Sequence, residues 1–320
     1  MIKRTIEISN GPTHISSQRK QLILKRDGEQ IGQIPCEDIG MVIVDHPATS
    51  ISLPAISLLM KEKAAFIICG TDHLPQGMFL PFADHTQIVT RLHTQIDAPK
   101  PLQKRLWKQI VQAKIRAQAD NLQSNSAPHK LLMNLAKDVK AGDTTNREAH
   151  AAKVYWQNWL TCPDDIEVDD EGLEIIADAY RRDRHGDSPN SLLNYGYAIL
   201  RAAVARAIVS AGLQPALGIH HKNRSNPFCL ADDLMEPFRP IVDCRVRELF
   251  FAGETEINQE TKAQLLDLLT IRINYKEHSG PLMVSLHHYV ASFVRCLERT
   301  ETLMEIPQLC HLVDTELCGL

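Results

Sequence analysis

The spacing of the hydrophobic residues changes once along this chain, near residue 81, and that change limits the possible fold more than any other feature. Before it, apolar and polar residues alternate, as from Ile2 to Ile8, or apolar residues form short runs such as Met41–Val44. Both patterns are typical of strands. The pair Asp27-Gly28 between two such runs predicts a hairpin, because both central positions of a type I′ turn need positive φ. The first eighty residues therefore predict a β-rich domain.

Behind Pro81 the apolar residues recur at helical spacing. The clearest run, which Gly212 ends as a C-terminal glycine would, is Leu193, Tyr197, Leu200, Val204, Ile208 and Ala211. Further helices are expected at about residues 101–122, 146–160, 171–181, 243–252, 258–273 and 281–304, and a short one at 53–60 among the strands. We therefore predict an α+β protein, with an N-terminal β-sheet or β-sandwich domain at residues 1–85 and a larger all-α domain at residues 86–320.

The charge balance argues mildly against a dedicated nucleic-acid binder. The 320 residues contain 35 basic and 39 acidic side chains, a net charge of −4, whereas DNA-binding domains are usually basic. Charge is concentrated locally, because residues 99–119 carry six Lys or Arg and no acid, and residues 164–174 carry seven acids and no base. The basic run is a candidate DNA-binding patch, and a solvated helix face explains it at least as well.

No uninterrupted apolar stretch resembles a secretory signal or a membrane span, so we expect the protein in the cytoplasm. The eight cysteines are scattered without a Cys-x-x-Cys pair, and we expect reduced, mostly buried thiols. Phosphate-binding loops, dinucleotide-binding turns, nucleophile elbows and zinc helices are missing from the sequence. Nucleotide-driven motors and cofactor redox enzymes therefore lose support.

Candidates for chemistry lie near predicted helix starts in the second domain: Glu148, His221, and the pair Asp233 and Glu236. Each also has a structural explanation. Thr145 with Glu148 fits a capping box, as does Asp233 with Glu236, and His221 lies in a polar stretch typical of an exposed loop. Caps and surface histidines are common, so the structural explanation suffices for each residue taken alone.

Taken together, two carboxylates and an imidazole can hold a hard divalent cation and leave positions open for water and phosphate oxygens. Bound Mg²⁺ or Mn²⁺ offsets the negative charge of a phosphodiester and of its transition state. The combination therefore predicts a metal-dependent enzyme that acts on DNA phosphodiesters, with Glu148, His221 and Glu236 as the catalytic metal ligands.

Three segments resemble the CRISPR adaptation integrase family, whose large subunit is the "Cas one" endonuclease. They are Arg147–Trp156, Leu192–Arg201 and Gly212–Asp243, and within the last the stretch Leu217–Pro240 is similar to the type II branch in particular. The front domain matches in its order as well, with Ile34-Pro35 before the strand predicted at 41–44. The resemblance covers most of the chain and is weakest towards the C-terminal end.

This resemblance implies an N-terminal domain that pairs two subunits into a homodimer. It implies a helical domain that binds Mg²⁺ or Mn²⁺ through Glu148, His221 and Glu236, with Asp233 as a supporting carboxylate. In the implied reaction, the 3′-hydroxyl of captured DNA attacks a phosphodiester at the border of a CRISPR repeat, by transesterification and without ATP. The implied partners are DNA, the small subunit "Cas two" and, in type II systems, the effector nuclease.

On that interpretation, several basic side chains become candidates for contacts with the DNA backbone. They are Lys100, Lys104, Arg105, Lys108, Arg181, Arg182 and Arg184. Two alternatives stay open. Water can be the nucleophile in the same site, which gives a hydrolytic nuclease for branched or damaged DNA. The acids can also be caps only, in a DNA-binding scaffold without catalysis.

Overall fold

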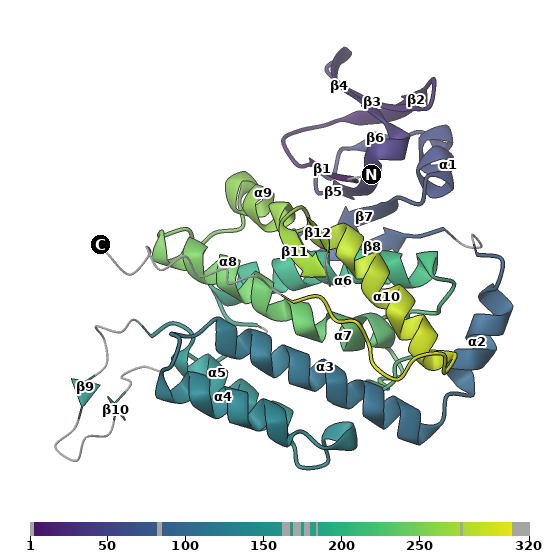
Figure 1. Ribbon diagram of the computed structural model, residues 1–320. Helices are drawn as coiled ribbons and strands as arrows, with labels where there is room; N and C mark the ends of the chain where they lie inside the picture. Colours follow the sequence, from purple (N-terminus) through teal and green to yellow (C-terminus); the bar gives the residue numbers. More distant parts are fainter. Residues whose placement is uncertain are drawn as a thin grey trace.

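The computed structural model describes residues 3–81, 85–161, 167–168, 174–175, 180–183, 185–275 and 278–308 (Figure 1). Strands of the first eighty residues form one end of the molecule, and helices make up most of the remainder. The predicted α+β class is therefore confirmed.

The front half contains two four-stranded sheets, with the orders β4-β3-β2-β6 and β1-β5-β7-β8. The strands are β1 Arg4–Ile8, β2 His14–Gln18, β3 Gln21–Arg26, β4 Glu29–Pro35, β5 Ile39–Val44, β6 Ser50–Ile51, β7 Ala65–Cys69 and β8 Pro75–Phe79. The predicted hairpin turn is confirmed, because Asp27 and Gly28 join β3 to β4 with φ of 52° and 82°. Helix α1, Leu53–Lys61, also forms as predicted, although Ser52 before it makes no side-chain capping bond.

Strand β5, an inner strand of the second sheet, is buried on both faces. In β5, Val42 and Val44 belong to a core inside the front half, whereas Met41 and Ile43 belong to the core of the helical half. Successive side chains of a strand point to opposite faces, so an uninterrupted apolar run fits a sheet that is covered on both sides. Strand β8 ends at Phe79 and the next helix begins at Ile88, but the two halves share this core, so the domain division at residue 85 stays a prediction.

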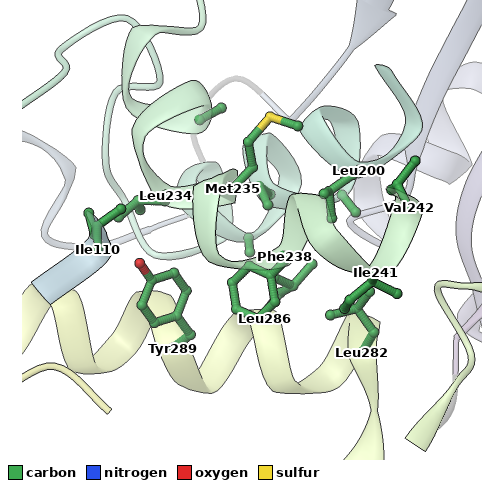
Figure 2. Close-up of a cluster of buried hydrophobic side chains, with 14 of the residues drawn as sticks. Ile110, Leu200, Leu234, Met235, Phe238, Ile241, Val242, Leu282, Leu286 and Tyr289 are labelled. Carbon is green, nitrogen blue, oxygen red and sulfur yellow. The ribbon is translucent and has the colours of Figure 1, made fainter. Parts of the chain in front are cut away.

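The helices of the rear half are α2 Ile88–Ile96, α3 Lys100–Asp120, α4 Ala127–Asp138, α5 Arg147–Asn158, α6 Asn190–Ser210, α7 Cys229–Met235, α8 Arg239–Phe251, α9 Gln259–Asp267 and α10 Leu282–Leu297. Two short 3-10 turns matter for the site, η2 Ala141–Asp143 and η4 Glu236–Phe238. Phe238 lies in a core in which Leu286 and Tyr289 of α10 face it (Figure 2). This packing fixes the segment from α7 to α8, which carries Asp233 and Glu236.

Helical periodicity located α3, α5, α6, α8 and α10, and Gly212 follows α6 with a φ of 68°. The helix predicted at 171–181 is wrong where the structure describes it. Glu174–Ile175 forms strand β10 and pairs with β9, Glu167–Val168, while most of the predicted helix lies outside the described residues. The many acids of this region would repel one another along a helix.

The helix predicted at 258–273 is also too long. Helix α9 ends at Asp267, and Arg272–Tyr275 forms β11, which pairs with β12, His278–Pro281. The β-branched residues Ile271 and Ile273 favour an extended backbone at this point.

Among the described helices, α6 is long and apolar enough to cross a membrane by length and composition alone. However, 78% of its apolar window is buried inside the protein. An all-round apolar helix in such surroundings is a core helix.

Candidate active site

Asp233 holds the loop that carries His221. It lies in α7 with no exposed surface. Its Oδ2 accepts hydrogen bonds from the backbone N–H groups of Ile219 (2.7 Å) and His220 (3.0 Å), and its Oδ1 accepts one from the backbone N–H of His221 (3.1 Å). Hydrogen bonds to an ionised acceptor are stronger than neutral ones. Asp233 therefore fixes a loop outside its own helix and does not form a capping box with Glu236.

The imidazole of His221 is oriented by the same carboxylate. Its Nδ1 lies 2.6 Å from Asp233 Oδ1, and this hydrogen bond raises the pKa of His221 although partial burial lowers it. Nε2 is then the nitrogen left for another partner, as in metal sites where a carboxylate orients a histidine ligand. The tight loop needs Gly218, because a Cβ there would lie 2.4 Å from the His221 backbone oxygen and 2.9 Å from Asp233 Oδ2.

Glu148 lies in the first turn of α5 but does not cap it. The N-cap residue is Asn146, with a left-handed φ of 53°, and Asp143 of η2 accepts a hydrogen bond from the backbone N–H of Glu148 at 2.9 Å. The capping box between Thr145 and Glu148 is therefore wrong. The Glu148 carboxylate instead reaches α3, where its Oε1 lies 2.7 Å from Lys114 Nζ.

Glu236 is buried in η4 and is held by two cations. Its Oε1 accepts a hydrogen bond from Arg239 Nε at 2.9 Å, and its Oε2 lies 2.6 Å from Lys114 Nζ. Burial alone would raise the pKa of Glu236, but Arg239 and Lys114 outweigh it and lower that pKa to about 2. The carboxylate is therefore ionised at neutral pH.

The structure thus brings Glu148 and Glu236 onto one ammonium group, with His221 near enough for its charge to act on Glu236. Within the described ranges, no three His, Cys, Asp or Glu side chains are arranged to hold a metal ion as they stand. The donor set nevertheless fits one. The ammonium group of Lys114 lies between the two acids, where a metal ion would lie. Glu236 Oε2 is buried and forms an ion pair with Lys114, but it has no hydrogen-bond partner. Two carboxylates and an imidazole suit a hard divalent ion.

Arg239 also contacts a buried polar network formed by Tyr197, Tyr155 and Asp243. Its guanidinium lies over the ring of Tyr197, 4.6 Å from the centroid. The hydroxyls of Tyr197 and Tyr155 both donate hydrogen bonds to Asp243. Burial raises the pKa of Asp243 to about 7, although the two hydroxyls lower it.

The buried Trp107 of α3 packs against the loop that carries His220 and His221. Its ring stacks on His220 with centroids 4.0 Å apart and an interplanar angle of 2°, and it meets His221 edge-on at 5.7 Å. Trp107, Lys114 and Arg239 were assigned no role in the site from sequence. Only Arg239 carried a usable signal, since it follows Glu236 at i+3 beside a helix start.

A cleft of about 470 Å³ opens beside His221. Its lining includes the amides of Gln95 and Gln103, the cations of Lys222 and Arg224, and apolar side chains such as Phe293. An apolar wall with a few polar groups is the usual form of a ligand site.

The side chains predicted to contact DNA differ in their exposure to solvent and in their hydrogen bonds within the protein. Lys108 is half-buried, and the exposed residues are Lys100, Lys104, Arg105 and Arg181. The guanidinium of Arg182 is engaged within the protein, where it donates hydrogen bonds to the side chains of Asn190 and Asn194. Arg184 lies outside the described residues.

Known structures of similar fold include a casposase bound to an integration product. It matches with a TM-score of 0.73 and 21% identity, over 95% of this chain and 93% of that chain. A Cas6-RT-Cas1–Cas2 complex matches with a TM-score of 0.71 and 19% identity, over 98% of this chain and 36% of that chain. At these identities the likeness shows the fold alone.

Sequence comparison is more specific. The family described as "CRISPR associated protein Cas1" matches residues 6–270. The chain is 33% identical over 319 residues to the CRISPR-associated endonuclease Cas1 of Neisseria meningitidis serogroup C (strain 8013), with 98% of this chain and 99% of that protein covered. Both matches extend over the loop of His221 and over the helices that carry Glu148 and Asp233, so the chain belongs to the Cas1 family.

Proposed function

We propose that this protein is a divalent-metal-dependent DNA integrase of CRISPR spacer acquisition. The observation that carries the proposal is the convergence of Glu148 and Glu236 on one cation, beside a His221 that Asp233 orients. The meningococcal relative is named as an endonuclease, which supports action on nucleic acid. The casposase of similar fold is bound to an integration product, which supports joining.

Glu148, His221 and Glu236 would hold Mg²⁺ or Mn²⁺, which supplies charge neutralisation for the phosphodiester and its transition state. Asp233 keeps the His221 ring oriented, and Arg239 keeps Glu236 in place. Such supporting contacts hold ligands in position before the substrate arrives. In the proposed reaction, the 3′-hydroxyl oxygen of captured DNA attacks a phosphorus of the repeat. The bond from that phosphorus to the 3′ oxygen of the repeat strand breaks, and this oxygen leaves as a new 3′-hydroxyl that takes up the proton lost by the attacking group. One phosphodiester replaces another, so no ATP is consumed.

DNA would be held by local basic patches, because the net charge of −4 gives little general attraction. The exposed Lys100, Lys104 and Arg105 of α3, with Lys108 and with Arg181 before α6, are the proposed backbone contacts. The similar complex that contains Cas2 supports a Cas2-like partner subunit. The meningococcal relative supports the type II branch, and with it a role for the effector nuclease. A homodimer through the β-rich domain and a cytoplasmic location complete the proposal.

The test uses the full-length protein and a labelled DNA 3′ end with a repeat-containing duplex. Glu148→Ala and His221→Ala are expected to lower the rate of joining by about 100-fold or more, because even residues that only support metal ligands cost 10–100-fold. Lys137→Ala, an exposed change on α4, is the matched control. Joining at the wild-type rate by Glu148→Ala would show that the site is assigned wrongly.

The same experiment separates the alternatives. A hydrolytic nuclease, which the name of the relative also favours, yields cut DNA without joined products. A DNA-binding scaffold yields neither product and shows no saturable Mn²⁺ binding that His221→Ala removes.

A further inference from the structure

Lys114 lies in the middle of the candidate metal site, on a side chain that comes from a different helix than either acid. Its Nζ is 2.7 Å from Glu148 Oε1 and 2.6 Å from Glu236 Oε2. The side chains of Lys114 and Glu236 are 13% and 6% exposed, so water screens this arrangement little. Without the ammonium group, two carboxylates would face each other in a largely buried space.

The position between these two oxygens has room for one cation. Mg²⁺ binds carboxylate oxygens at about 2.0–2.1 Å, closer than the ammonium nitrogen does here, and it needs the same lone pairs. An ion held by Glu148 and Glu236 therefore replaces Lys114 and does not add to it. Lysine suits such an exchange, because its charge sits on a flexible four-carbon stem. Arg239 is different, since it binds the other oxygen of Glu236 and can stay.

We propose that Lys114 is a tethered counter-ion of the metal-free site, which neutralises Glu148 and Glu236 until a divalent ion displaces it. This inference rests on the proposed metal site, but it concerns a residue outside the ligand set. It has two consequences. The metal-free protein keeps its acids in place and stays folded, and metal binding is weakened by the contacts that must be broken.

The first measurement is Mn²⁺ affinity without DNA, from the electron paramagnetic resonance signal of free Mn²⁺. Lys114→Met removes the competing charge and keeps a side chain of similar length, so we expect binding about tenfold tighter or more. Lys114→Arg keeps the charge and is expected to bind no more tightly than the wild type. Lys137→Met, on the exposed face of α4, is expected to change nothing.

The second measurement is thermal unfolding in the presence of EDTA, which does not depend on any metal. In the otherwise wild-type protein, Lys114→Met is expected to lower Tm by several degrees. In the Glu148→Gln variant, where one of the two repelling charges is gone, the same change is expected to lower Tm by clearly less. If Lys114→Met does not fold without metal, recovery of folding by the added Glu148→Gln change supports the same conclusion, and failure to recover contradicts it.

The outcomes distinguish the two proposals. Equal or weaker Mn²⁺ binding by Lys114→Met, with normal binding by the wild type, overturns the counter-ion role and leaves the proposed function intact. If neither the wild type nor any variant binds Mn²⁺, the proposed metal site is wrong, and so is the displacement of Lys114 by a metal ion. Normal Mn²⁺ binding and displacement without DNA joining would leave the counter-ion role standing and contradict the integrase.

Discussion

The acids of the site differ in the partners that hold them. Asp233 accepts hydrogen bonds from three backbone N–H groups and lies within hydrogen-bond distance of the His221 imidazole. Glu236 is paired with Arg239, and Glu148 and Glu236 share Lys114. Composition and spacing alone left Glu148, His221 and Glu236 with structural explanations, and only their order, their sequence context and the family resemblance selected them together as candidates. Their partner could not be predicted, because Lys114 is 34 residues from Glu148 and nothing in a basic run shows which member turns inward.

Asp243 gives a prediction for stability against pH. Burial raises its pKa in the folded protein to about 7, above its ordinary value of 3.8. The folded state therefore binds more protons than the unfolded state between these values, and this stabilising contribution is lost as the pH rises towards 7. Asp243→Asn cannot titrate, so the free energy of unfolding is expected to fall less between about pH 5 and pH 8 in this variant than in the wild type. Urea denaturation at each pH measures it, and parallel profiles would contradict the assignment.

Among the elements, helices with a regular apolar stripe were predicted well, including the short α1, whereas α4 and α7 were not predicted. Helix α4 was missed because its signal lies in its start. Ser126 accepts a hydrogen bond from the His129 N–H and Pro128 follows in the first turn, while the buried stripe is only Leu132, Leu135 and Ala136. Helix α7, which carries Asp233, was not predicted, because its seven residues are all buried and show no amphipathic pattern. Tertiary packing, which the local sequence does not record, decides such elements.

The connection between α6 and α7 gives a prediction at this scale. Gly218→Ala places a Cβ against the His221 backbone oxygen and Asp233, so the loop must move and buried N–H groups lose their acceptor. We expect a loss of about 1–3 kcal/mol in the free energy of unfolding and a marked fall in DNA joining. Gly77→Ala is the control, because a Cβ there meets nothing within 4 Å. Unchanged activity and stability in Gly218→Ala would mean that the loop is not held as described.

On the scale of the whole molecule, the two halves are tied by a buried ion pair as well as by apolar packing. Lys262 of α9 donates to Asp45, which directly follows β5, and His73 Nδ1 lies 3.0 Å from the same carboxylate. The side chains of Lys262 and Asp45 are 5% and 1% exposed. The change of periodicity near residue 81 revealed the two halves but not this tie, because partners so far apart in sequence leave no local pattern.

Lys262→Met tests that tie. Among the residues that the structure describes, the change leaves the buried Asp45 carboxylate with His73 as its remaining side-chain partner, and loss of one member of a buried pair costs about 3–5 kcal/mol. We expect a decrease of that order in the free energy of unfolding, measured in urea, with Lys130→Met on the exposed side of α4 as the control. A decrease no larger than that of the control would contradict the role of the pair.

Strand β5, which is covered on both faces, also limits how the molecule can respond to force. Met41 and Ile43 are anchored in the helical half while Val42 and Val44 are anchored in the front half, so the sheet cannot slide without opening one of the two cores. Close-packed interiors resist such deformation. A subunit attached to the β-rich end would therefore stand at a constant distance from the acids on the helices. The fold therefore holds the β-rich end and the helices that carry Glu148 and Glu236 at a fixed separation.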